Sequence, residues 1–123
     1  MMFEVGAAAR FRAFHSMPSR PPPEDELHAH DYRVEVVAEQ ESLDERGMVC
    51  DLDVVTASLA DVVDRARDRD LAHVCAAEVV TVEALAAWIH GQLTMPLRIE
   101  RVEFLAVRVW ESEDAFGGIR ARL

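Results

Sequence analysis

The sequence contains no lysine, because all 13 basic residues in its 123 positions are arginine. Catalysis through a lysine Schiff base is therefore excluded. The basic residues are outnumbered by 23 acidic residues, which gives a net charge of −10. A nucleic-acid partner requires clustered cations that replace phosphate counterions, so this composition argues against nucleic-acid binding.

Cysteine is also scarce, and long hydrophobic runs are missing. Cys50 and Cys75 have no C-x-x-C spacing and cannot form a disulfide framework, which predicts a reducing, cytoplasmic environment. The first nine residues include Glu4, lack the basic start of a signal peptide and are too few to span a membrane. We therefore expect no membrane partner.

The amino-acid balance, 50% hydrophobic and 29% charged, fits one globular domain over residues 1–123. Apolar residues alternate from Phe3 to His15 and predict a long strand with His15 at the end of its apolar face. Four prolines and three acidic residues then predict a loop over residues 18–26. His28, His30 and Tyr32 follow at even positions, so a second strand should present both histidines on one face.

Two helices are predicted in the middle of the chain. Apolar residues recur at three- and four-residue spacing from Val55 to Ala66, after a short apolar run at residues 47–51. Thr81 is suited to cap a second helix. The predicted apolar face of this helix consists of Leu85, Trp88, Ile89 and Gln92. Pro96 is expected to end it.

Two further strands complete the predicted fold. β-branched and aromatic residues indicate a strand over residues 98–110, with Ile99, Val107 and Val109 on one face. A short last strand is expected after the pair Gly117 and Gly118. The order ββααββ predicts an α+β fold in which a four-stranded antiparallel sheet carries two helices on one face.

Three histidines are the clearest candidates for chemistry. His15 ends the first strand, and His28 and His30 occupy alternate positions of its neighbour, so the three rings can converge above the sheet. Three neutral imidazoles leave a fourth position open on zinc, as a catalytic site requires. Judged by spacing alone, a metal site and three unrelated polar residues at strand ends explain the positions of these histidines equally well. His73 and His90 fit that second interpretation, His90 as a histidine on a helix surface.

Five segments follow the pattern of a known family in order and at about the same spacing. They are F-R-A-F-H at residues 11–15, L-H-A-H-D-Y-R-V-E-V at 27–36, L-D-E-R-G-M-V-C-D-L at 43–52, T-V-E-A-L-A-A-W-I at 81–89 and V-R-V-W-E-S at 107–112. In these segments the chain resembles the 6-pyruvoyltetrahydropterin synthase and 6-carboxytetrahydropterin synthase family of the tunnelling fold. The resemblance implies a zinc-dependent lyase that acts on the side chain of a reduced pterin such as a dihydroneopterin.

The resemblance also implies roles for individual residues. His15, His28 and His30 correspond to the zinc ligands, although the family's H-G-H is H-A-H here. Glu111 corresponds to the carboxylate that holds the aminopyrimidinone edge of a pterin, and Thr81 to a wall of that subsite. Such a carboxylate can accept two parallel N–H bonds. Without the resemblance, a solvated acid at a strand end explains Glu111 better.

The catalytic relay departs from the family. Four residues before H-A-H, where the family has a cysteine, the chain has Glu24, and the family's Asp-His pair falls on Arg67 and Asp68. The resemblance thus implies Glu24, with Asp68 as a second candidate, as the group that moves a proton. Glu26, two residues before His28, is the alternative base, because the proline-rich loop leaves the alignment with the family's cysteine position open. His73 is a candidate for the missing histidine.

Three explanations of this departure remain open. A branch of the family carries glutamate in place of the cysteine and cleaves the side chain of dihydroneopterin to give 6-hydroxymethyl-dihydropterin, and a carboxylate can act as a base beside a zinc-polarised oxygen. Alternatively, the pocket processes a changed substrate. In the third explanation the protein is a non-catalytic zinc- or pterin-binding protein. Cys75 is interpreted as a small apolar residue rather than a nucleophile.

Assembly into a homo-oligomer is expected. Long unpaired sheet edges in so small a chain favour pairing between subunits. The resemblance implies trimers that stack into hexamers around a tunnel, with active sites at subunit interfaces. In such an assembly Glu111 can serve a site whose zinc is held by a neighbouring chain.

Overall fold

Alternating apolar residues form two long antiparallel strands in the computed structural model, which describes residues 1–123. β1 (Phe3–His15) pairs with β2 (His28–Gln40) along its whole length. β3 (Phe104–Trp110) and β4 (Phe116–Arg122) complete a four-stranded sheet in the order β1-β2-β3-β4. The predicted antiparallel sheet is confirmed, although β4 begins before its two glycines rather than after them.

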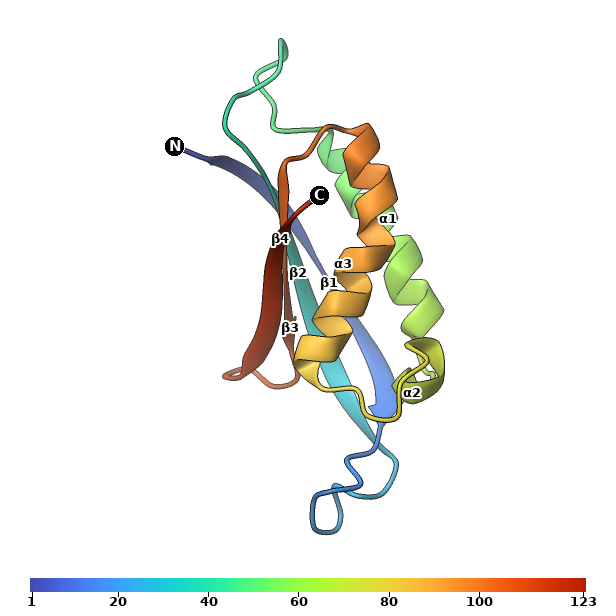
Figure 1. Cartoon of the computed structure of the whole chain (residues 1–123). Helices are drawn as coiled ribbons and strands as arrows, with labels where there is room; N and C mark the ends of the chain where they lie inside the picture. The colour runs from blue at the N-terminus through green and yellow to red at the C-terminus, as the bar shows by residue number, and fades with distance from the viewer.

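Three helices cover one face of this sheet, which confirms the predicted α+β architecture (Figure 1). The two long helices are α1 (Leu52–Ala66) and α3 (Val82–Ile99). A short helix that the sequence pattern did not predict, α2 (Leu71–Val74), lies between them in the chain. The core fills the space between the sheet and the helices. None of the helices has the length and apolar character needed to cross a membrane.

The end of α3 and the start of β3 differ from the prediction. α3 continues past Pro96, and Ile99 is its last residue rather than part of a strand. A proline inside a helix lacks an N–H and crowds the preceding turn, but this one lies in the last turn, which fully buried Leu97 anchors in the core. Ile99 is 76% exposed, whereas Val107 and Val109 face the core as predicted.

The prediction of His90 as a surface residue is wrong. Its side chain is buried on α3, and its Nε2 has no hydrogen-bond partner. Leu85 and Ile89 of the predicted face are buried, whereas Trp88 and Gln92 are only half-buried. The physical reason is that α3 packs against β3 and β4 and also against α1, so a wider part of its surface is covered than one apolar stripe.

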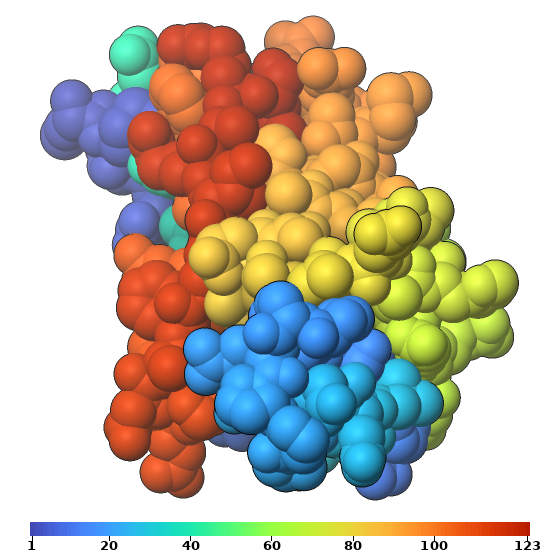
Figure 2. All heavy atoms as spheres, turned by 60° about the horizontal axis from the view of Figure 1, so that its bottom comes forward, coloured from blue at the N-terminus to red at the C-terminus, as the bar shows by residue number.

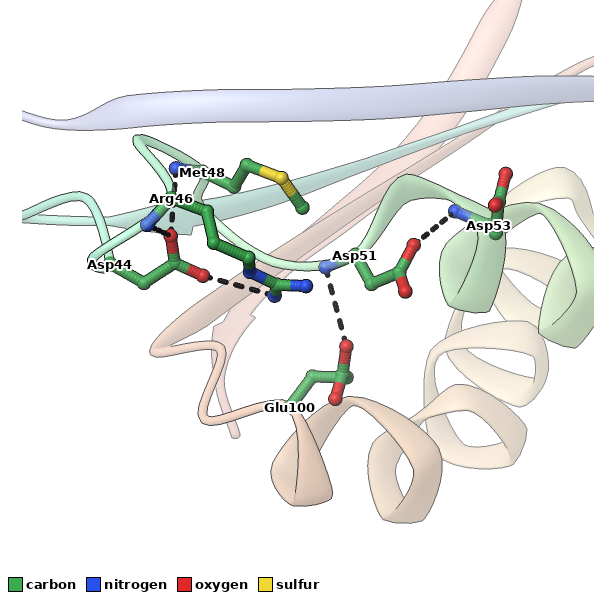
Figure 3. A network of polar contacts seen from close by, with 6 residues as sticks. All are labelled: Asp44, Arg46, Met48, Asp51, Asp53 and Glu100. Carbon is green, nitrogen blue, oxygen red and sulfur yellow. Dashed lines mark hydrogen bonds and ion pairs between the residues drawn. The ribbon is translucent and has the colours of Figure 1, made fainter.

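The loop of residues 41–51 connects β2 to α1 at the end of the sheet opposite the three histidines (Figure 1). Asp44 accepts hydrogen bonds from the backbone N–H groups of Arg46 (2.8 Å) and Met48 (3.0 Å) (Figure 3). Asp51 caps α1, and its own N–H donates to Glu100 at 3.3 Å. Residues 43–52, one of the five segments that carry the family resemblance, therefore form a turn followed by the N-terminal cap of α1.

Two glycines give a matched test of the packing. A Cβ on Gly118 in β4 would lie 2.5 Å from the backbone oxygen of Val107, which cannot move without disturbing the β3–β4 pairing. We expect Gly118→Ala to lower the free energy of unfolding by about 1–3 kcal/mol. A Cβ on Gly91 in α3 would meet no other atom within 4 Å, so Gly91→Ala should raise the free energy of unfolding by about 0.5–1 kcal/mol. Urea denaturation measures both, and equal effects of the two changes would contradict this packing.

Candidate active site

The β1–β2 register brings the three predicted histidines together. His15 lies opposite His28, and His30 follows on the same face of β2. Their ring centroids are 4.5 to 5.0 Å apart. One ring nitrogen of each residue lies within 4.8 Å of the others, so the three rings can hold a single metal ion.

Backbone carbonyls orient two of the rings. The Nδ1 atom of His15 is 3.0 Å from the oxygen of Val80, and the Nδ1 atom of His28 is 2.8 Å from the oxygen of Glu26. A carbonyl oxygen can only accept, so each Nδ1 carries the proton and each Nε2 keeps its lone pair. The Nε2 atom of His15 is buried without any partner. Metal-binding histidines have this arrangement, so these residues fit a zinc ion.

The surroundings of His30 favour its neutral imidazole. Burial, followed by the positive charge of His15, lowers the pKa of His30 below its ordinary value, and the carboxylate of Glu111 opposes this shift. Tyr32 lies beneath the rings, with its centroid 5.6 Å from that of His30. Burial and the charge of Glu111 raise the pKa of Tyr32 above its ordinary value, so its phenol remains neutral. Neutral imidazole is the form that binds a metal.

The histidines form one wall of a cavity of about 500 Å³. Glu24, Thr81 and Glu111, which the sequence analysis proposed for catalysis and pterin binding, line the same cavity. The remaining lining residues are Met17, Arg20, Pro23, Val82 and Glu83. Figure 2 views this end of the molecule, where the loop between β1 and β2 (blue) lies beside the segment that leads into α3 (yellow).

A sequence model of the family described as 6-pyruvoyl tetrahydropterin synthase matches residues 4–121. The chain belongs to this family. The fold and the family together support a pterin synthase-like function and an enzyme of the pterin synthase type. Among curated proteins, none matches the sequence.

Solved structures of the 6-pyruvoyl tetrahydropterin synthase family have the same fold. The Plasmodium vivax enzyme is similar at 14% identity with a TM-score of 0.81, over 100% of this chain and 99% of that chain. A variant of it, described as a catalytic residue mutant, has glutamate replaced by alanine and gives a TM-score of 0.82 at 14% identity and the same coverage. The Caenorhabditis elegans enzyme is 18% identical with a TM-score of 0.74, over 98% of this chain and 96% of that chain.

The start of α3 contributes Thr81, Val82 and Glu83 to the lining of the cavity. The hydroxyl of Thr81 accepts the backbone N–H of Ala84 at 3.1 Å, which confirms Thr81 as the helix cap. Glu83, which the sequence analysis did not single out, packs over Gly117, where an added Cβ would lie 2.9 Å from its Oε1. Acidic residues are common in the first turn of any helix, so the sequence offered no specific signal for Glu83.

Other candidates of the sequence analysis lie outside the cavity. Glu26 does not line it and contributes only its carbonyl, to His28. Asp68 does not line it either, and its N–H donates to the oxygen of Arg12 beside the edge of β1. His73 is exposed on α2. Of the residues that the sequence proposed for proton transfer, Glu24 is thus the one that lines the cavity beside the histidines of its own chain.

Glu111 and the three histidines line the cavity of the same chain. The predicted assembly would allow Glu111 to serve a site whose zinc is held by a neighbouring chain. Glu111, one residue after β3, lies near His30 of its own chain, and its role toward a neighbouring subunit stays a prediction. Within one chain, the carboxylate of Glu111 and the three imidazoles therefore share one cavity.

Cys75 is expected to be a poor nucleophile. Burial raises the pKa of its thiol to about 11. Because the thiolate is the reactive form, roughly one Cys75 thiol in a thousand is ionised at pH 8. We expect iodoacetamide to label Cys75 at least tenfold more slowly in the folded protein than after unfolding in guanidinium, with the rate rising up to about pH 11. Peptide mass spectrometry measures this, and equal rates at pH 7 would contradict the assignment.

Proposed function

We propose that this protein is a zinc-dependent lyase that acts on the side chain of a dihydroneopterin-type pterin, with glutamate in place of the family's cysteine. The observation that carries the proposal is the shared cavity, in which three convergent imidazoles lie alongside the carboxylates of Glu24 and Glu111. In this proposal the three histidines bind the metal, Glu111 binds the pterin ring and Glu24 transfers the proton.

His15, His28 and His30 would hold the zinc ion, each through one ring nitrogen. When bound there, zinc supplies Lewis acidity that polarises an oxygen of the substrate side chain. The carbonyls of Val80 and Glu26 keep two of the rings in the tautomer that exposes a lone pair. The ring of the fully buried Tyr32 lies edge-on to those of His15 and His30.

Glu111 is proposed to bind the ring of the pterin. A carboxylate can accept two parallel N–H bonds from the aminopyrimidinone edge, and charge-assisted bonds of this kind are short and strong. Thr81 and Glu83, which line the same cavity, are proposed to complete the wall of this subsite. This arrangement would direct the substrate side chain toward the histidines.

Glu24 is proposed as the general base. For C–C cleavage it would remove the proton of a side-chain hydroxyl, so that this C–O becomes a carbonyl while the electron pair of the broken C–C bond passes into the pterin ring, which then takes up a proton. For C–O cleavage it would instead remove a proton from a side-chain carbon, so that a double bond forms as the phosphate on the neighbouring carbon leaves. A glutamate-to-alanine variant of the Plasmodium vivax enzyme is described as a catalytic residue mutant, which supports a carboxylate in such a role here. Asp68 lies outside the cavity of its own chain, so any part it takes in the reaction requires a neighbouring copy.

The test is to incubate the zinc-loaded protein with dihydroneopterin and with its triphosphate and to separate the pterin products by liquid chromatography and mass spectrometry. We expect at least one substrate to give a pterin with a shortened or rearranged side chain. Binding of both substrates without turnover would reject the lyase and support the non-catalytic zinc- or pterin-binding protein. Failure to bind either pterin would reject both functions.

Glu111→Gln tests the pterin subsite. The change keeps the shape of the side chain but removes its charge, and hydrogen bonds to a charged group contribute about 1.5–3 kcal/mol. We expect the dissociation constant for the pterin to rise roughly 10- to 100-fold. Fluorescence titration measures it, and Glu113→Gln, at an exposed acid outside this cavity, is the matched control. Equal affinities of the two variants would remove Glu111 from the subsite.

A homo-oligomer, trimeric or hexameric, is proposed as the functional form. The order β1-β2-β3-β4 leaves β1 and β4 as edge strands. Residues 68–70 cover only the end of β1, where the N–H of Phe14 donates to the oxygen of Arg69 at 2.9 Å. Open strand edges favour pairing with another copy. Light scattering on the preparation used for the assay measures the assembly.

A further inference from the structure

The cavity contains three carboxylates but only one guanidinium. Glu24, Glu83 and Glu111 line it together with Arg20. The Nε atom of Arg20 donates to Oε2 of Glu24 at 3.0 Å. Among the cavity carboxylates, Glu24 is therefore the one with an arginine partner.

The loop that carries this pair is closed by its own backbone. The N–H of Met17 donates to the oxygen of Glu24 at 2.8 Å, and the N–H of Arg20 donates to the oxygen of Met17 at 2.9 Å. Residues 21–23 are all proline, which fixes φ along the segment that joins Arg20 to Glu24. The backbone of the loop thus fixes the segment that carries Arg20 and Glu24 next to the end of β1.

The contact engages one oxygen of the carboxylate and leaves the other for the substrate. Arg20 is bonded to Oε2 of Glu24, whereas Oε1 has no partner in the chain. An arginine that holds one oxygen restricts rotation of the carboxylate, and small displacements of a catalytic group have large effects on rate. Its charge also offsets part of the negative charge that the three carboxylates place in one cavity.

We propose that Arg20 is a positioning residue that acts on the chemical step through Glu24. The inference rests on the proposed function of Glu24 as the base. It predicts that Arg20→Gln lowers kcat about tenfold, while KM changes by less than twofold. Arg20→Lys should recover part of the loss, because an ammonium can still donate to Oε2 of Glu24.

The deciding experiment is a double-mutant cycle with steady-state kinetics. In the Glu24→Gln background, Arg20→Gln should change kcat by less than twofold, because the group through which it acts is already lost. Arg46→Gln removes another exposed ion pair, to Asp44 at 3.1 Å, and should leave the kinetics unchanged. Circular dichroism and zinc content verify that each variant is folded and loaded.

Four results would overturn the inference. If Arg20→Gln raises KM for a phosphorylated pterin and leaves kcat unchanged, Arg20 binds substrate instead of positioning the base. If Arg20→Gln lowers kcat equally with and without Glu24, it acts independently of that residue. If Glu24→Gln abolishes turnover and Arg20→Gln has no effect, the positioning role of Arg20 is rejected while Glu24 remains the proposed base. Full activity of Glu24→Gln would instead reject the proposed base, and the positioning role with it.

Discussion

Glu24→Gln is expected to lower kcat by about 10²–10⁴-fold, with a much smaller effect on pterin affinity. Glutamine has the size of glutamate but cannot accept a proton at neutral pH. Glu24 lines the cavity beside the three histidines, whereas Glu111, the residue proposed to bind the pterin ring, follows the last residue of β3. Stopped-flow or steady-state product analysis with the zinc-loaded protein measures kcat, and fluorescence titration measures affinity.

The neighbouring acids of the loop supply the controls for this experiment. Asp25→Asn changes an exposed carboxylate that does not line the cavity and should leave kcat within twofold. Glu26→Gln tests the alternative register of the proline-rich loop. Loss of turnover in Glu26→Gln with full activity in Glu24→Gln would mean that the base has been assigned to the wrong residue.

His28→Ala is expected to reduce bound zinc from one ion per chain to less than a tenth and to abolish turnover. Two imidazoles retain a zinc ion far less tightly than three. His28 is preferable to His15 for this test, because His28 is half-buried and His15 is part of the core at 5% exposure. Loss of metal can then be separated from loss of folding.

Two measurements make the zinc experiment decisive. Elemental analysis gives the stoichiometry, and thermal denaturation gives the stabilisation that a ligand of the folded state must produce. Wild-type protein should melt at a higher temperature with zinc than after treatment with a chelator, and His28→Ala should lose this difference. His73→Ala, at an exposed histidine on α2, should keep both the zinc and the difference. Full zinc content in His28→Ala would reject the proposed metal site.

The main elements of the fold were predictable because hydrophobic periodicity reports directly on burial. Alternation predicted β1 and β2, and the spacing after Val55 predicted α1. The end of α3 was not predictable, because Pro96 is a helix breaker by local rules and only the burial of Leu97 shows why the helix continues. His90 was misplaced for the same reason, since its burial depends on how α3 packs against other elements, which the helix pattern does not show.

The candidate site was predictable where it depends on strand geometry. His28 and His30 share a face in any strand, and an antiparallel partner that ends in His15 brings the third ring to them. The family resemblance singled out Glu24 and Glu111. Neither approach found Arg20 or Glu83, because an arginine in a polar loop and an acid in a first helical turn are ordinary surface residues by sequence.

The sequence by itself determined the alternation of faces, the helix caps and the identity of the three imidazoles, because these depend on neighbours within a few residues. Only the tertiary structure decided which carboxylates meet the imidazoles. The loop that carries Glu24, the start of α3 and the residue after β3 converge on one cavity from positions far apart in the chain. Such convergence depends on how the sheet and helices pack, and no local pattern contains that information.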